Sequence, residues 1–146
     1  MDIITSIISV FLVSVIELWL GIPLGLYLNL DPILIVIISA AGSILSAVLV
    51  IILGENVRKW FIKWRYGDKS PEHGKIYDIW EKYGVIGLGL LSPLLFGAPL
   101  GAALGIGFGA SKNRLLLWMT VGILIWSLIL TSAALYGILS FQSLYK

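Results

Sequence analysis

One acidic side chain lies inside an apolar stretch of this sequence. Glu17 stands within the apolar block Ile3–Leu30, whereas the other seven acidic residues lie at block ends or in the polar centre of the chain. An ionisable group at membrane depth costs on the order of 3 kcal/mol and is by default a functional hypothesis. Neither this block nor the later block Val85–Ala110 contains a Lys or Arg that could pair with it. We therefore expect Glu17 to hold a proton or a cation; the alternative is a neutral carboxylic acid bonded to backbone groups that Gly21 and Pro23 leave free.

A Gly-x-Pro-Leu-Gly motif occurs twice, as Gly21–Gly25 and, 76 residues later, as Gly97–Gly101. Broken backbone at membrane depth is tolerated only where protein or a water-filled cavity surrounds it. Gly/Pro-interrupted segments in corresponding positions of two halves point to a transport site made of discontinuous helices. Ser92, just before a proline, could donate to a substrate or cap a half-helix. We expect each broken segment to form the tip of a helical hairpin. The tip residues would line the path of a transported substrate: Gly21, Pro23, Gly25, Ser92, Pro93, Gly97, Pro99 and Gly101.

Enzymatic machinery is not visible in the sequence. The chain has no cysteine, which excludes disulfides, thiol catalysis and zinc-cysteine sites. His73 lies in a hydrophilic stretch, where a solvated side chain is the expectation. The run Gly105–Gly109 lacks the strand, helix and later acid of a dinucleotide fingerprint. We expect no enzyme activity, no cofactor and no metal site.

Composition sets the class of protein. Of the 146 residues, 59% are hydrophobic and 12% are charged, against roughly 25% charged residues in soluble domains. The blocks Ile33–Leu53 and Leu115–Leu139 carry no charge and have the length of a spanning helix, about 20 residues. The net charge of +2 and the lack of a recognition motif argue against a nucleic-acid partner. The sequence predicts an all-α integral membrane protein.

The order of the blocks predicts one membrane domain over residues 1–146. It divides into repeat one (about 3–53), an amphipathic linker (54–83) and repeat two (about 84–140). Each repeat is a Gly/Pro-broken re-entrant hairpin followed by a transmembrane helix, and the two repeats are inverted relative to one another. The alternative is that Ile3–Leu20 crosses the membrane completely.

Positive charge gathers in the centre of the chain. Nine of the ten Lys and Arg residues share one side if the broken blocks return to their side of origin, and eight do so if those blocks cross. The positive-inside rule places segment 54–83 in the cytoplasm in both cases. We expect the chain to be integral to the cytoplasmic membrane, with both termini outside if the hairpins are re-entrant.

The central segment also has helical periodicity. Val57, Trp60, Phe61 and Trp64 follow the i, i+3, i+4, i+7 spacing of an amphipathic helix in the headgroup region. A second stretch, 76–83, repeats the spacing. Basic residues beside the cytoplasmic leaflet gain about 1 kcal/mol each from anionic lipid. We expect lipid-surface contacts from these residues: Arg58, Lys59, Trp60, Lys63, Trp64, Arg65, Lys112 and Arg114.

The order of these motifs resembles the putative small multi-drug export proteins, a family that looks distantly related to the DedA-like (SNARE-associated, VTT-type) membrane proteins. The resemblance covers roughly residues 14–139 and rests on the run Glu17–Gly25, the basic central segment, Tyr83-Gly84 and the stretch Pro93–Pro99. It implies two inward-pointing re-entrant hairpins, each followed by a spanning helix. DedA-like proteins are associated with moving lipids or lipid-linked phosphates across membranes, with proton coupling suggested for some.

By this resemblance Glu17 matches the acidic residue that enters the first hairpin. The sequence departs from the DedA pattern at the second hairpin, where Leu90 and Phe96 stand near the places of two arginines, and a second acid is missing from the first. These departures weaken the case for an anionic-headgroup site. Lys112 and Arg114 keep the basic start of the last helix.

Two functional hypotheses follow from the sequence. The first is a membrane translocator, an exporter or a flippase- or scramblase-like protein, that moves a lipid or a hydrophobic cation with proton coupling through Glu17. The alternative is a non-transporting assembly or scaffold protein that binds a partner through its cytoplasmic amphipathic helix. The expected partners are membrane lipids and an amphipathic substrate, and a homo-oligomer is compatible with the sequence.

Overall fold

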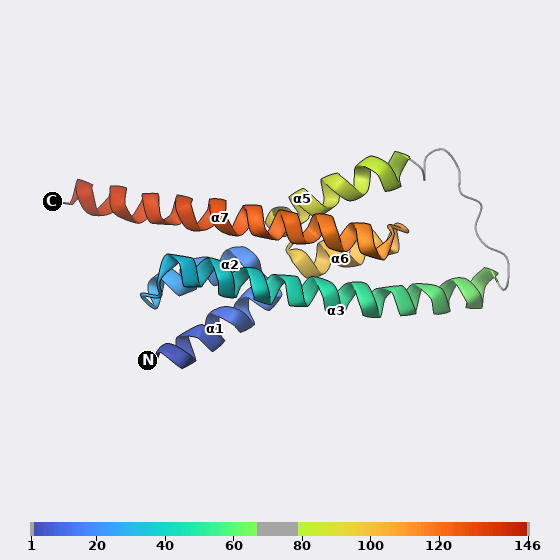
Figure 1. Cartoon of the computed structure of the whole chain (residues 1–146), viewed down its shortest axis with the longest axis horizontal. Helices are drawn as coiled ribbons and strands as arrows, with labels where there is room; N and C mark the ends of the chain where they lie inside the picture. Colours follow the sequence, from blue (N-terminus) through green and yellow to red (C-terminus); the bar gives the residue numbers. More distant parts are fainter. Residues whose placement is uncertain (1, 67–78, 146) are drawn as a thin grey trace.

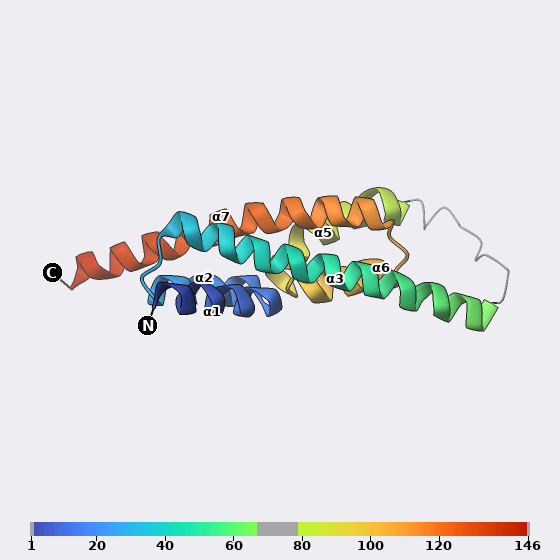
Figure 2. The ribbon, with the colours of Figure 1, turned by 60° about the horizontal axis from the view of Figure 1, so that its bottom comes forward.

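The computed structural model describes residues 2–66 and 79–145, and the regular structure in these ranges is helical. Two long helices form the frame and shorter helices pack against them (Figures 1 and 2). The elements are α1 (Ile3–Ile16), α2 (Leu18–Tyr27), α3 (Pro32–Tyr66), the π-helical turn η1 (Trp80–Gly84), α5 (Val85–Leu95), α6 (Ala98–Gly107) and α7 (Lys112–Leu144).

The two long helices have the length and hydropathy of membrane spans. These properties hold for Pro32–Asn56 within α3 and for all of α7. They include both charge-free blocks of the sequence, so the predicted spanning helices are confirmed as long apolar helices. The helices run antiparallel along the long axis, and the N- and C-termini lie at one end of it, away from the end of α3 at Tyr66 (Figure 1).

The shorter helices form two helix–break–helix pairs. The chain breaks at Glu17, which is extended (φ −141°, ψ 116°), between α1 and α2. It breaks again at Phe96 and Gly97 between α5 and α6. The two breaks point toward one another near the middle of the long axis, from opposite ends (Figures 1 and 2).

The predicted position of the first break is wrong by about one helical turn. The segment Gly21–Gly25, expected at the tip, lies within α2. Pro23 is tolerated there because it and Trp19, whose carbonyl loses its helical partner, both lie on the exposed face of α2. In α6, by contrast, Pro99 occupies the first turn, where the missing N–H would be unpaired anyway.

The same backbone turn follows α2 and α6 at an interval of 80 residues, whereas the sequence motif recurs after 76. After α2, the N–H groups of residues 28, 29 and 30 donate to the carbonyls of residues 24, 26 and 25; after α6, residues 108, 109 and 110 donate to residues 104, 106 and 105. Positive φ occurs at equivalent positions, Asn29 (56°) and Gly109 (90°), as in a left-handed helix C-terminus. The same interval equates Glu17 with Gly97.

Proline removes one helical hydrogen bond in α5, and α7 packs closely against this segment. Pro93 lacks the N–H that would bond to Gly89. The indole of Trp126 donates to the neighbouring carbonyl of Leu90 over 2.5 Å, and the Gly89 carbonyl oxygen lies against Gly122 of α7. The broken segment is therefore enclosed by protein, as a bilayer interior requires.

The central segment differs from its prediction. The stripe from Val57 to Trp64 does not form a separate helix, because α3 continues without interruption to Tyr66. No Gly or Pro occurs between Glu55 and Tyr66 to end the helix. Trp60 is exposed on it. His73 and most of the predicted turn and second stretch (67–78) lie outside the described residues.

Gly122 provides the clearest test of this packing. A β-carbon at this position would overlap the Gly89 carbonyl oxygen, whereas one at Gly137 of the same helix meets nothing within 4 Å. We expect Gly122→Ala to destabilise the protein by about 1–3 kcal/mol through overpacking. Gly137→Ala should be neutral or stabilise it by up to about 1 kcal/mol through helix propensity. Thermal unfolding in detergent measures both, and equal effects would contradict the close crossing of α5 and α7.

Candidate functional site

The two helix breaks meet at Glu17 and Gly97. A β-carbon built on Gly97 would lie 2.8 Å from both carboxylate oxygens of Glu17. Gly97 is buried and has φ +83°, a backbone conformation that L side chains rarely adopt. Glycine is therefore required here twice, for the turn and for the approach of the carboxylate.

The electrostatic surroundings of Glu17 are unusual for an apolar protein. Glu17 is the N-cap of α2 and Gly97 is the N-cap of α6, so two helix N-termini adjoin one carboxylate. Helix N-termini favour negative charge. Oε2 of Glu17 is buried and has no hydrogen-bond partner among the described residues. A buried acceptor without a partner is costly, and a proton or a cation would satisfy it.

Buried hydroxyls surround each hairpin. Ser14 of α1 contacts Gly21 of α2, and Ser92 of α5 contacts Gly101 of α6. The Ser43 hydroxyl donates to the Ser14 carbonyl over 2.7 Å. The side chain of a residue at Gly21 or Gly101 would overlap these serines. Each hairpin therefore closes on a serine–glycine contact.

Two of the central hydroxyls have no hydrogen-bond partner in the described part of the chain. They belong to Ser14 and Ser39, both fully buried. Gly25 of α2 packs on Ile35, which lies one helical turn before Ser39 on α3. On the second hairpin, the hydroxyl of Ser92 donates to the Met119 sulfur over 3.2 Å. Sequence reasoning missed Ser14, Ser39 and Ser43; the signal available was the i, i+4 spacing of Ser39 and Ser43 within a charge-free helix.

The predicted tip residues have different surroundings. Gly21, Gly25, Gly97 and Gly101 are buried at helix contacts, as are Ser92 and Pro93. Pro23 is on the exposed face of α2, and Pro99 is partly buried in α6. The structure thus brings Glu17 to Gly97 and each serine to its glycine, and it leaves Pro23 outside this group.

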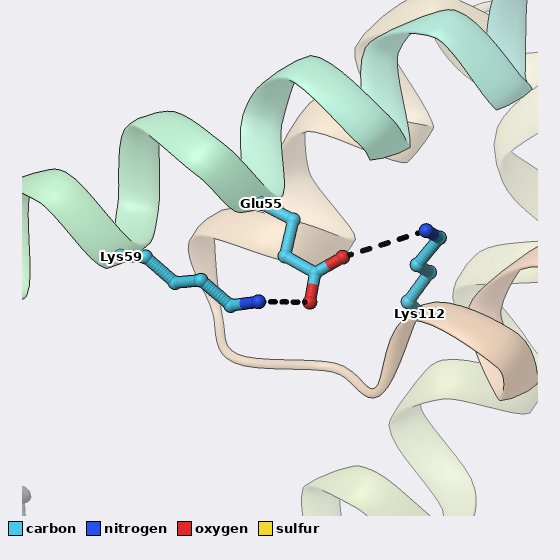
Figure 3. A network of polar contacts seen from close by, with 3 residues as sticks. All are labelled: Glu55, Lys59 and Lys112. Carbon is cyan, nitrogen blue, oxygen red and sulfur yellow. Dashed lines mark ion pairs between the residues drawn. The ribbon is translucent and has the colours of Figure 1, made fainter.

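Charged residues gather at the end of the molecule away from the termini. Glu55 pairs with Lys59 (3.0 Å) on α3 and with Lys112 (3.8 Å) at the start of α7, as Figure 3 shows. Arg114 donates to the carbonyl of Lys82 over 3.0 Å. These contacts join α3 to α7 and η1 to α7.

The residues expected to contact the lipid surface differ in their exposure and in their ion pairs. Lys59 and Lys112 pair with Glu55 but keep 72% and 45% of their side-chain surface exposed. Lys63 and Trp60 are exposed as well. The side chains of Arg58, Trp64 and Arg65 lie outside the described residues, and contact with lipid stays a prediction for the whole set.

These features define a helical membrane protein in which two discontinuous helix pairs meet at one acidic residue. The chain belongs to the family described as "Putative small multi-drug export protein", whose sequence profile matches residues 17–129. That description supports a general export role in a membrane and indicates a transporter rather than an enzyme. Searches of curated proteins and of solved structures found no match.

The contact at the breaks can be tested by a double-mutant cycle. We expect Gly97→Ala to destabilise the protein by about 1–3 kcal/mol or more, because it adds backbone strain and a clash with Glu17. Combining it with Glu17→Ala should recover the part due to the clash, giving a coupling of at least about 0.5 kcal/mol. Gly87→Ala in α5, where a β-carbon meets nothing within 4 Å, is the matched control. Purely additive effects in thermal unfolding would show that the two residues do not touch.

Proposed function

We propose that this chain is a membrane translocator that exports an amphipathic molecule, a lipid or a hydrophobic cation, through the region where the two breaks meet. The observation that supports this most directly is the buried, unpartnered Oε2 of Glu17 against Gly97. A packing role alone would favour a neutral apolar residue at this position, because an ionisable group costs free energy at membrane depth. Exchange of a proton or a cation by Glu17 during transport would explain why the protein keeps a group with this free-energy cost.

We further propose that α1–α2 and α5–α6 are re-entrant hairpins in inverted repeats. Three observations support this arrangement. The breaks approach from opposite ends of the long axis (Figure 1), equivalent turns follow each pair at an interval of 80 residues, and each first limb crosses a glycine of the following long helix, Gly42 or Gly122. Inverted repeats that meet near the midplane are common in transporters. The DedA-like relationship stays a prediction.

The chemistry of one cycle follows from the contacts of Glu17. In the ionised state the carboxylate can hold the cationic group of a substrate, helped by desolvation that strengthens charge–charge attraction. In the protonated state it can donate to an uncharged polar group and needs no counter-ion. The hydroxyls of Ser14 and Ser39 lack partners and could bond to the polar part of the passing molecule. Protonation of Glu17 from one side would release a cation and so couple export to a proton gradient.

Transport in liposomes tests the role of Glu17. We expect purified protein to move a fluorescent lipid or a cationic dye, and Glu17→Gln to abolish the response of that transport to an imposed pH gradient. Glu55→Gln is the matched control, because Glu55 lies in the charged end and not at the breaks. No movement of either probe, with or without a gradient, would contradict translocation and leave the scaffold hypothesis. If transport by Glu17→Gln still responded to the pH gradient, proton coupling through Glu17 would be contradicted but translocation would not.

Single cysteines test the topology, since the native chain has none. We expect the variants Asp2→Cys and Ser143→Cys to react with a membrane-impermeant thiol reagent added outside the cell. Lys63→Cys should react only after the membrane is permeabilised. The basic central segment should be inside by the positive-inside rule. If positions 2 and 63 react from the same side, α1–α2 crosses the membrane and the re-entrant arrangement is wrong.

A further inference from the structure

A pocket opens between the two long helices near the end that carries the termini. Ile33, Val36 and Ile37 line it from the first turns of α3, and Leu128, Thr131 and Ser132 line it from α7. Its volume is about 240 Å³, below the roughly 300–1,000 Å³ of sites that enclose a drug-sized molecule. The pocket can therefore take one part of a molecule rather than the whole.

The chemistry of the wall selects an uncharged, apolar occupant. No lining residue is ionisable, and the polar groups are the two hydroxyls of Thr131 and Ser132. Thr131 is only 3% exposed, and its hydroxyl has no hydrogen-bond partner in the part of the chain that the structure describes. Ile33, Ile37 and Leu128 are more than half exposed, so the pocket opens on the outer surface of helices that have the properties of membrane spans.

The equivalent place at the other end of the two long helices is filled. At the interval of 80 residues, Thr131 corresponds to Ile51, which is fully buried. A β-carbon at Gly54 would lie 3.3 Å from Ile106 of α6, so glycine lets α6 close on α3 there. The residue equivalent to Gly54 is Ala134, and α2 packs more sparsely on α7 than α6 does on α3. The pocket is thus specific to the end that carries the termini and is not imposed by the equivalent backbone turns.

We propose that this pocket binds one acyl chain of a membrane lipid from the leaflet on the side of the termini. The occupant is a hydrocarbon chain because the wall is apolar and uncharged, the volume suits a chain segment, and the opening faces the lipid. Binding of a lipid chain here does not require the protein to transport anything.

Photocrosslinking tests the site. The full chain is reconstituted in vesicles of phosphatidylethanolamine and phosphatidylglycerol that contain a phosphatidylcholine with a diazirine at the end of one acyl chain. We expect labelling of the segments around Ile33–Ile37 and Leu128–Ser132 about tenfold above that of equally exposed apolar residues such as Leu12, which corresponds to about 1.4 kcal/mol of preference. A hydrophobic alkylammonium with the same diazirine should show no such enrichment.

Two variants fill the pocket from opposite walls, Val36→Phe on α3 and Ser132→Trp on α7. Both should lower the labelling to background, whereas Ile125→Trp, on an exposed part of α7 outside the pocket, should leave it unchanged. Thermal unfolding of each variant establishes that it is folded. Uniform labelling, persistence of the label in either filled and folded variant, or preferential labelling by the alkylammonium would overturn the proposal. Because the readout is binding, failure of transport in liposomes would leave this result intact.

Discussion

The carboxylate of Glu17 lies against the α-carbon of Gly97, and no side chain can stand between them. Both helix pairs must therefore bring their breaks to one point. Other close contacts serve the same end, since Gly42 and Gly122 let the first limb of each pair approach a long helix. Small residues at crossings are the general means of close helix packing in membranes, where lipid offers no hydrophobic driving force. Part of the glycine content of the chain is therefore explained by close contacts between helices, whereas a β-carbon at Gly87, Gly107 or Gly137 would meet nothing within 4 Å.

Two backbone carbonyls in this interior accept hydrogen bonds from side chains of another helix. Trp126 bonds to the Leu90 carbonyl, and the Ser43 hydroxyl bonds to the Ser14 carbonyl. Some buried side-chain atoms, by contrast, have no hydrogen-bond partner among the described residues. They include Glu17 Oε2 and the hydroxyls of Ser14 and Ser39 around the first helix pair. A protein that needed these residues only for packing could replace them with apolar ones at no loss. Their presence supports the proposal that this region is more than a packed core.

Length, charge and Gly/Pro content were sufficient to predict the two long apolar helices and the two broken pairs, whereas the role of Glu17 stays a prediction. The position of the first break was not predictable from the motif match, because aligning Pro23 with Pro99 ignores that the two prolines occupy different turns of α2 and α6. The backbone repeat is instead set by positive φ after each helix, where Asn29 and Gly109 are chemically different residues. The buried serines were missed since an isolated hydroxyl in an apolar helix can face either protein or lipid.

The two ends of the molecule differ in the contacts that hold them. Away from the termini, the contacts of Glu55 with Lys112 and of Arg114 with the Lys82 carbonyl join α3 to α7 and η1 to α7. Exposed ion pairs of this kind contribute about 0–1 kcal/mol, so thermal motion can break and re-form them. At the other end apolar packing holds α7 against α3 and is interrupted by a pocket. Apolar packing also supports the charged end, where Ile51, Val85 and Leu115 are fully buried, so the two ends differ in the ion pairs of one and the pocket of the other.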